Sequence, residues 1–375
     1  MSIKNPFILE NNVADEYFCD RDAETALLRR HIENGRNVVL LSPRRVGKTG
    51  LLYHFFRQPD IQRDYYTILI DLYTTKTLEE MVDVMGKAIF TALSSKSQKA
   101  AAAFMAYVKA LYGGISIDEE GNPMIKVGVD KARDPRTTVE EMFSYIDHAD
   151  KPCIIAIDEF QVVAGYPDGN AEALLRTYIQ RSLNGHYIFS GSQRTLMSEM
   201  FLSPSRPFYQ STTMMNIDVL DKAVYADFAT RLFEQYNKSI TPQTIEDVYA
   251  KFEGITWYLQ RTLNELFAET EPHQQCTPDM VPQAINSILA ANHFSYSSTL
   301  FQLPSKQKDL LIAICQEGKA TQITSGKFIK QHRLLSASSV QSAIKGLLDK
   351  EFVTMEMGVY EVYDKFFALW LRRNS

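Results

Sequence analysis

The stretch that decides the fold is Ser42-Pro43-Arg44-Arg45-Val46-Gly47-Lys48-Thr49. It follows a short apolar run, Val38 to Leu41, of the kind that is buried on both faces of a parallel sheet. It precedes a segment with helical periodicity that we expect to extend from Lys48 through Phe56. A strand, a glycine-containing loop and a helix in this order predict a loop that holds phosphate groups.

The residue types of this loop suit a magnesium-bound triphosphate. The N-terminus of a helix attracts anions, Lys48 can reach the β- and γ-phosphates, and the Thr49 hydroxyl can bind Mg²⁺. Ser42 stands where such loops usually begin with glycine. Arg44 and Arg45 either clamp phosphate, face a partner or are solvated. The candidate nucleotide-binding residues are Ser42, Pro43, Arg44, Arg45, Val46, Gly47, Lys48, Thr49 and Gly50.

Two further strands end in polar residues that fit the same chemistry. Cys153 to Ile157 is apolar and is followed by Asp158 and Glu159. We expect Asp158 to hold the magnesium shell, and Glu159 to act as the catalytic base that deprotonates the attacking water. The strand Tyr187 to Ser190 is followed by Gly191 and Ser192, and either Ser190 or Ser192 is expected to sense the γ-phosphate.

Strand and helix patterns alternate across residues 1–216, which predicts an α/β core with a parallel sheet covered by helices on both faces. Asp20 is the expected N-cap of the first helix. A hairpin at about residues 113–130 interrupts the alternation. Residues 217–300 show only helical patterns and predict a small helical lid domain. Residues 301–375 have the helix and hairpin order of a winged-helix domain.

Composition excludes several classes of protein. The 375 residues are 45% hydrophobic and 23% charged and carry a net charge of −5, so the chain as a whole is not a coat for nucleic acid. Its 4 cysteines are scattered, which argues against a zinc site and for a reduced, cytoplasmic protein. No apolar run reaches the roughly 20 residues of a membrane helix. Lys and Arg outnumber Asp and Glu after Pro304, so DNA binding there stays open beside protein contact and intramolecular packing.

The motifs resemble the archaeal-type ATPase family, within the signal-transduction (STAND) ATPases and the wider class of phosphate-loop NTPases that includes AAA+ proteins. The phosphate loop and Asp158-Glu159-Phe160-Gln161 are the specific parts of the resemblance. It extends to Phe18 to Glu24, to Arg206-Pro207-Phe208-Tyr209 and to the winged-helix tail. The resemblance implies ATP and Mg²⁺ as ligands, and it implies that the nucleotide base lies near Pro6 and Phe7, which could otherwise be an N-terminal anchor.

Two departures from the family pattern bear on function. Many members carry a Gly-Arg pair where this chain has Gln210-Ser211, so hydrolysis stimulated by an arginine from a neighbouring subunit is in doubt. The proline of a Gly-x-Pro element is replaced in Gly254-Ile255-Thr256. The leading expectation is a slow ATPase that acts as a nucleotide-dependent switch on an unknown protein partner. The alternatives are a nucleotide-sensing, DNA-binding regulator and a scaffold with a vestigial pocket; the oligomeric state stays open.

Overall fold

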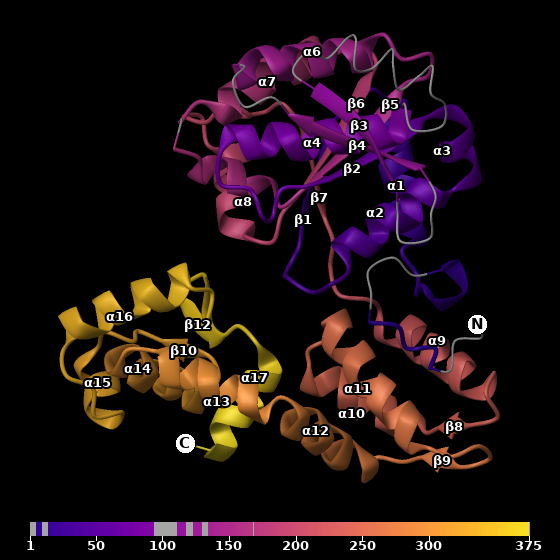
Figure 1. Ribbon diagram of the computed structural model, residues 1–375. Coiled ribbons are helices and arrows are strands. Elements are labelled where there is room, and N and C mark those ends of the chain that lie inside the picture. Colours follow the sequence, from indigo (N-terminus) through magenta and orange to yellow (C-terminus); the bar gives the residue numbers. More distant parts are fainter. Residues whose placement is uncertain are drawn as a thin grey trace. The chain divides into compact units, whose positions relative to one another are not determined.

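The computed structural model describes residues 5–9, 14–93, 111–117, 123–129, 134–167 and 169–374. The chain divides into two compact units (Figure 1). One unit comprises Glu10–Leu220, and the other combines Met1–Leu9 with Asp221–Ser375. The first nine residues therefore belong with the C-terminal unit, although they precede the α/β unit in the sequence.

A five-stranded parallel sheet forms the centre of the first unit, in the order β2-β5-β6-β1-β7. Four of its strands match the apolar runs of the sequence. The fifth, β7, lacks such a run and forms a strand because it pairs with β1 along its whole length. The strands are β1 (Val38–Leu41), β2 (Tyr66–Asp71), β5 (Cys153–Asp158), β6 (Gly185–Ser190) and β7 (Thr213–Asn216).

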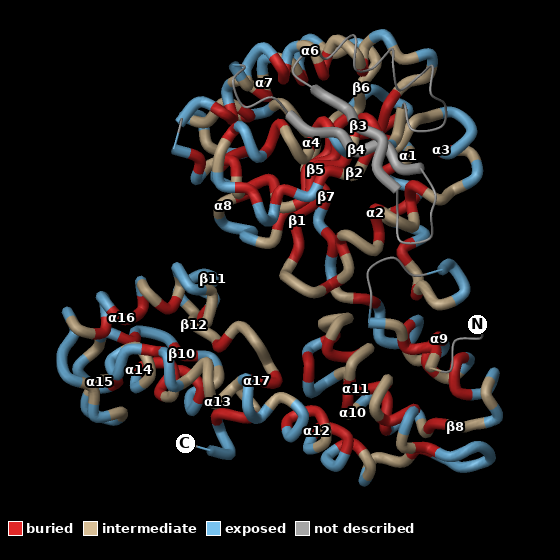
Figure 2. The backbone as a smooth tube through the Cα atoms, viewed as in Figure 1, coloured by how far each residue is buried: buried red, intermediate tan, exposed pale blue. Residues whose placement is uncertain are grey.

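Helices cover both faces of the sheet, as the sequence predicts. Alternate residues of β1 point to opposite faces, so Val39 and Leu41 belong to one apolar core while Val38 and Leu40 belong to another. Both cores are shielded from solvent, and the strands are buried throughout β1 and β5 (Figure 2). The first core packs against α4 (Leu78–Leu93), α6 (Pro135–Asp147), α7 (Ala171–Arg181) and α8 (Arg194–Leu202), and the second against α1 (Asp22–Glu33), α2 (Lys48–Arg57) and α3 (Pro59–Asp64).

The expected hairpin is present. Strands β3 (Leu111–Ile117) and β4 (Pro123–Val129) pair in antiparallel register over their full lengths. The turn is expected at residues 118–123; Pro123 is the first residue of β4, and residues 118–122 lie outside the described residues. One local prediction is wrong: Asp20 does not cap α1, because Asp20 and Arg21 both adopt left-handed backbone conformations and Arg21 occupies the N-cap position.

The C-terminal unit begins with the expected helices. Its first part also contains a short parallel pair, β8 (Ser239–Ile240) with β9 (Gln275–Cys276), which is too short to be seen in the sequence pattern. The helices are α9 (Lys222–Glu234), α10 (Pro242–Lys251), α11 (Thr256–Glu269) and α12 (Met280–Ala291).

The rest of the unit has the order expected for a winged helix, with a three-stranded sheet β10-β12-β11. Two helices of this part, α13 and α17, were not expected. Helix α17 forms because Phe366, Phe367 and Trp370 are buried along one of its faces. Within the described residues, no helix is long and apolar enough to cross a membrane. The elements are α13 (His293–Gln302), α14 (Ser305–Glu317), β10 (Ala320–Thr321), α15 (Gly326–Gln331), α16 (Ala337–Asp349), β11 (Val353–Glu356), β12 (Val359–Val362) and α17 (Lys365–Asn374).

Candidate nucleotide site

The phosphate loop connects β1 to α2, as the sequence predicts. Its two left-handed residues are Arg45 at φ 65° and Gly47 at φ 94°, and Gly47 is the N-cap of α2. Ser42 has no positive φ, so serine fits the first position of this loop without backbone strain. The replacement of the usual glycine by Ser42 is therefore compatible with the loop conformation.

Lys48 is the first residue of α2, and its side chain is almost completely buried. Its ammonium group donates to the Ser42 hydroxyl at 2.9 Å. Burial lowers the pKa of Lys48, while the nearby carboxylates of Asp158 and Glu159 act to raise it. A second, longer hydrogen bond runs from the ammonium group to the Pro43 carbonyl at 3.5 Å. A buried cation at a helix N-terminus, held by neutral oxygens of the loop, is well placed to receive an anion.

Thr49 faces the end of β5. Its hydroxyl donates to Oδ2 of Asp158 at 2.7 Å. The other carboxylate oxygen of Asp158 accepts from the Ser190 hydroxyl at the end of β6. A hydroxyl and a carboxylate in contact are hard oxygen donors of the type that Mg²⁺ prefers, so these residues fit the predicted metal.

Glu159 directly follows β5 and has a left-handed backbone conformation at φ 53°. The Ser192 hydroxyl donates to its Oε2 at 2.6 Å, and the Gln161 amide donates to the same oxygen. Ser190 and Ser192 thus contact different carboxylates, Asp158 and Glu159 respectively. The sequence pattern included Gln161 in its motif but did not predict that this residue would orient Glu159.

The two arginines of the loop contribute in different ways to its structure. Nε of Arg44 donates to the Ser192 carbonyl at 3.3 Å, which ties the phosphate loop to the segment after β6. Arg45 is one of the left-handed residues described above. Pro43, Val46 and Gly50 lie in the loop and the first turn of α2, and hydrogen bonds of Thr49 and Arg44 bring this stretch into contact with Asp158 and Ser192.

Pro6 and Phe7 lie in the C-terminal unit. Phe7 is fully buried, and its ring packs against Phe228, Phe233 and Phe267 at centroid distances of 6.4, 5.6 and 5.9 Å. This geometry corresponds to the anchor that the sequence left open as an alternative. Contact of these residues with the nucleotide base stays a prediction.

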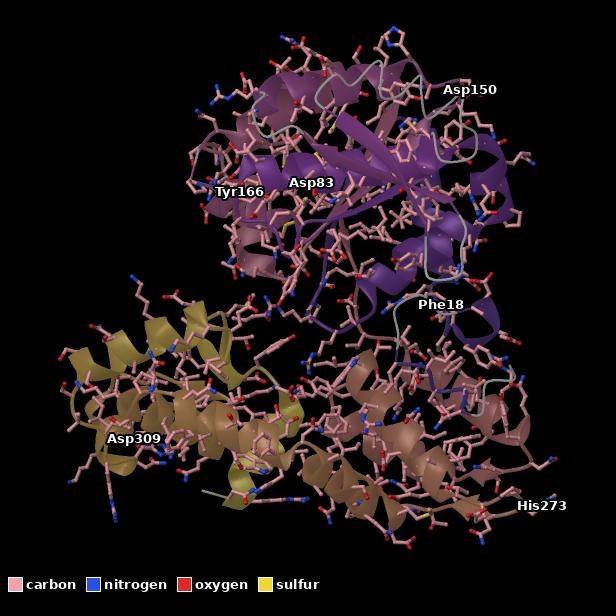
Figure 3. All side chains as sticks on the ribbon, in the orientation of Figure 1. Phe18, Asp83, Asp150, Tyr166, His273 and Asp309 are labelled. Carbon is pink, nitrogen blue, oxygen red and sulfur yellow. The ribbon has the colours of Figure 1, made fainter. Side chains whose placement is uncertain are left out.

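The segment before α1 contacts α2 directly. The Phe18 ring stacks on the His54 imidazole at a centroid distance of 4.4 Å, and Nδ1 of His54 lies 3.0 Å from the Asp15 carboxylate. Phe18 is labelled in Figure 3. The stack holds Phe18 against α2, and the chain continues from Phe18 through Asp20 to Arg21.

The element that contains Arg206 and Phe208 packs within its own unit. Arg206 forms ion pairs with Glu172 at 3.0 Å and Glu199 at 2.7 Å. Phe208 is fully buried next to Phe160, whose ring lies 5.3 Å away. The side chain of Arg206 is therefore paired with carboxylates of the same α/β unit.

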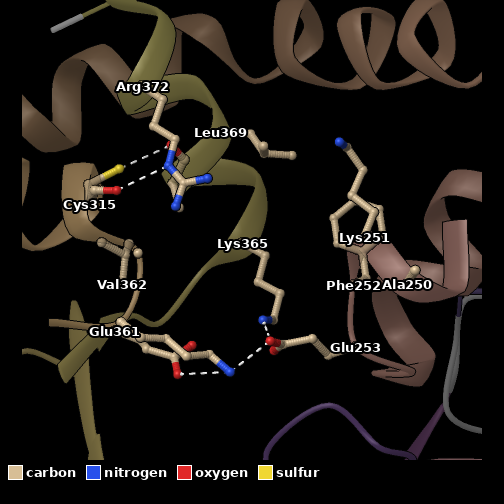
Figure 4. Close-up of a pocket in the computed structure, with 13 residues that line it drawn as sticks. Ala250, Lys251, Phe252, Glu253, Cys315, Glu361, Val362, Lys365, Leu369 and Arg372 are labelled. Carbon is tan, nitrogen blue, oxygen red and sulfur yellow. Dashed lines mark hydrogen bonds and ion pairs between the residues drawn. The ribbon is translucent and has the colours of Figure 1, made fainter. Parts of the chain in front are cut away.

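A separate cavity of about 210 Å³ lies in the C-terminal unit and contains none of the predicted site residues (Figure 4). Glu253 forms ion pairs there with Lys319 at 2.8 Å and Lys365 at 2.5 Å. These two cations lower the pKa of Glu253. Since Lys319 and Lys365 belong to the winged-helix part and Glu253 follows α10, the ion pairs join the two parts of this unit.

Two family models match the chain. The model described as "ATPase domain predominantly from Archaea" matches residues 18–262, and the model described as "Probable winged helix domain" matches residues 294–373. No curated protein gave a sequence match.

Solved structures share the fold over nearly the whole chain. A Walker-type ATPase of Pyrococcus abyssi is 20% identical with a TM-score of 0.67, covering 98% of this chain and 99% of that one. The Aeropyrum pernix ORC1 protein in complex with DNA is 13% identical with a TM-score of 0.56, covering 99% and 97%. These matches confirm the expected α/β phosphate-loop fold followed by a winged helix. The chain belongs to the family of ATPase domains found predominantly in Archaea.

Proposed function

We propose that this protein binds ATP with Mg²⁺, hydrolyses it slowly and uses the cycle as a molecular switch. The observation that carries the proposal is the contact between Thr49, at the start of α2, and Asp158, at the end of β5, beside the buried ammonium group of Lys48. The three side chains come from two separate motifs, and each has the chemistry that a metal-bound triphosphate requires.

Each protein group has a distinct role in the proposed reaction. Lys48 and the backbone N–H groups at the start of α2 bind the triphosphate and neutralise part of its charge. Glu159 accepts a proton from the attacking water as the water oxygen bonds to the γ-phosphorus and the bond to the bridging oxygen of ADP breaks. Ser192 and Gln161 hold the Glu159 carboxylate by the hydrogen bonds described above, which orients the base.

Thr49 and Asp158 are the residues that would hold Mg²⁺. When bound, the ion would offset negative charge on the triphosphate oxygens. Ser190 donates to Asp158 and so orients this carboxylate from the neighbouring strand.

The proposed switch needs groups that respond to the γ-phosphate and a part of the chain that moves in response. Ser190 and Ser192, at the carboxyl end of β6, are candidates to respond to the γ-phosphate. The ion pairs of Glu253 support joint movement of the helical and winged-helix parts as one body. We also propose that the chain is a STAND-type member of the AAA+ class, which rests on its motifs.

Nucleotide binding and turnover test this proposal on the purified full chain. We expect ATP and Mg²⁺ to bind, Lys48→Ala to abolish binding, and Glu159→Gln to retain binding while lowering turnover by about 100-fold or more. Absence of ATP binding by the unaltered protein would favour the vestigial scaffold. Equal turnover by the unaltered protein and Glu159→Gln would refute hydrolysis at this site.

A DNA-binding regulator is the second candidate. A structural neighbour is described in complex with DNA, and the exposed face of α16 carries Gln341, Ser342 and Lys345. Gln and Ser side chains can read base edges, but a single lysine supplies little attraction to phosphate. Titration with duplex DNA at low and high salt distinguishes the two: absence of binding even at low salt removes this candidate.

A further inference from the structure

Arg21 is buried beside the phosphate loop and has no role in the reaction described above. Only 4% of the residue is exposed, and it lies at the N-cap position of α1 with φ 79°. Left-handed backbone is uncommon for residues other than glycine. A buried guanidinium group in such a backbone needs strong compensating contacts.

The guanidinium group has three partners, two of which come from distant parts of the unit. Nη2 donates to the Val46 carbonyl at 3.1 Å and to the Asp218 carbonyl at 2.8 Å. Nη1 pairs with the Glu24 carboxylate one turn along α1. The planar fork of arginine can serve several acceptors at once, whereas lysine presents a single point of charge.

The bond to Val46 bears on phosphate binding. In a trans peptide the carbonyl of one residue and the N–H of the next point in opposite directions, and the described chain has no cis peptide bonds. Because Arg21 holds the Val46 carbonyl toward itself, the N–H of Gly47 is directed away from Arg21. This N–H belongs to the turn that opens α2, where the triphosphate is expected.

The bond to Asp218 bears on the connection to the C-terminal unit. Asp218 lies just beyond β7 and shortly before Asp221, where that unit begins. Ile217 donates from its backbone to the Leu41 carbonyl at 2.7 Å, at the start of the phosphate loop. The linker, residues 217–220, is thus bonded directly to Leu41 at the end of β1 and, through Arg21, to Val46 of the phosphate loop.

We propose that Arg21 is a positioning residue that couples the conformation of the phosphate loop to that of the linker at 217–220. Movement of the Val46 peptide on nucleotide binding alters a hydrogen bond whose donor also holds the linker. The coupling to nucleotide rests on the proposed function. The link between loop and linker through the hydrogen bonds of Arg21 does not.

Arg21→Lys tests this proposal, with Arg29→Lys as the matched control. Arg29 lies on the same helix and pairs at its surface with Asp60. Hydrogen exchange in the nucleotide-free protein is the first measurement. We expect Arg21→Lys to raise exchange at both the loop and the linker, and Arg29→Lys to leave both unchanged. If Arg21→Lys leaves hydrogen exchange unaltered at the loop or at the linker, the link between them through Arg21 is refuted.

Nucleotide binding is the second measurement. We expect Arg21→Lys to weaken ATP affinity by about 10- to 100-fold and, at saturating ATP, to abolish the change in linker exchange that ATP causes in the unaltered protein. Retention of that change would refute the coupling. Failure of the unaltered protein to bind ATP would instead refute the proposed function. Hydrogen exchange in the nucleotide-free protein would still test the link between loop and linker. Glu24→Gln, which keeps both carbonyl bonds, is expected to preserve the linker response.

Discussion

At the scale of the residue, the site depends on the buried ammonium group of Lys48. Lys48 pairs with the Ser42 hydroxyl and lies near Asp158 and Glu159, yet burial outweighs these carboxylates and lowers its pKa. The free protein therefore holds a lysine that loses its proton more readily than lysine in water. Bound phosphate would supply the missing negative charge and raise the pKa again.

This difference predicts how affinity depends on pH. ATP needs the charged form of Lys48, so affinity should fall as pH rises through the lowered pKa of the free protein, by up to tenfold per pH unit. Titration with ATP between pH values of about 7 and about 10 measures the slope. Lys48→Arg stays charged and should bind more weakly but with a flat profile. A flat profile in the unaltered protein would contradict the prediction.

At the scale of the element, the turn after β6 positions Glu159, the proposed catalytic base. Gly191 leaves room there for Gln161 and Met197, since a Cβ at this position would collide with both side chains. Gln161 bonds to Glu159, and Met197 is part of the apolar core. The glycine thus allows the base, its orienting amide and α8 to approach one another closely.

Gly191→Ala should therefore impair hydrolysis more than binding. The added methyl group displaces Gln161 from Glu159, and we expect turnover to fall by about 10- to 100-fold because the base loses its orientation. Lys48 and Thr49 are untouched, so ATP affinity should change little.

Gly165→Ala is the matched control for this prediction, since a Cβ there meets nothing within 4 Å. Turnover and affinity are measured for both variants. Normal turnover in Gly191→Ala would show that the contact between Gln161 and Glu159 is dispensable.

At the scale of the whole molecule, the N-terminal segment packs within the C-terminal unit. Asn5 donates to the Asn264 carbonyl at 2.9 Å, and the Asn264 amide donates to the Phe7 carbonyl at 2.8 Å. The N-terminal segment thereby completes the core of the C-terminal unit. The α/β unit lies between these two pieces in the sequence but has separate apolar cores.

Phe7→Ala should destabilise only the C-terminal unit. Loss of a fully buried ring costs about 3–5 kcal/mol of unfolding free energy. Hydrogen exchange should rise in α9 and α11 and stay unchanged in β1 and β5. Leu9→Ala, at a residue that is 37% exposed, is the control and should change the stability by less than about 0.5 kcal/mol. A rise in exchange confined to β1 and β5 would contradict this assignment.

The sequence alone determined the elements whose apolar period is strong and the loop whose chemistry is local. The apolar runs of β1 and β5 predicted buried strands, and Gly47, Lys48 and Thr49 predicted the opening turn of α2. Such patterns are readable because burial and backbone geometry act on neighbouring residues.

Only the tertiary structure decided contacts between distant residues. β7 forms because β1 offers it a pairing edge, and Arg21 acquires its partners because the fold brings Val46 and Asp218 together. Phe7 joins the C-terminal core rather than the α/β unit for the same reason. These contacts depend on how the elements pack, and local periodicity does not encode the packing partner of a single side chain.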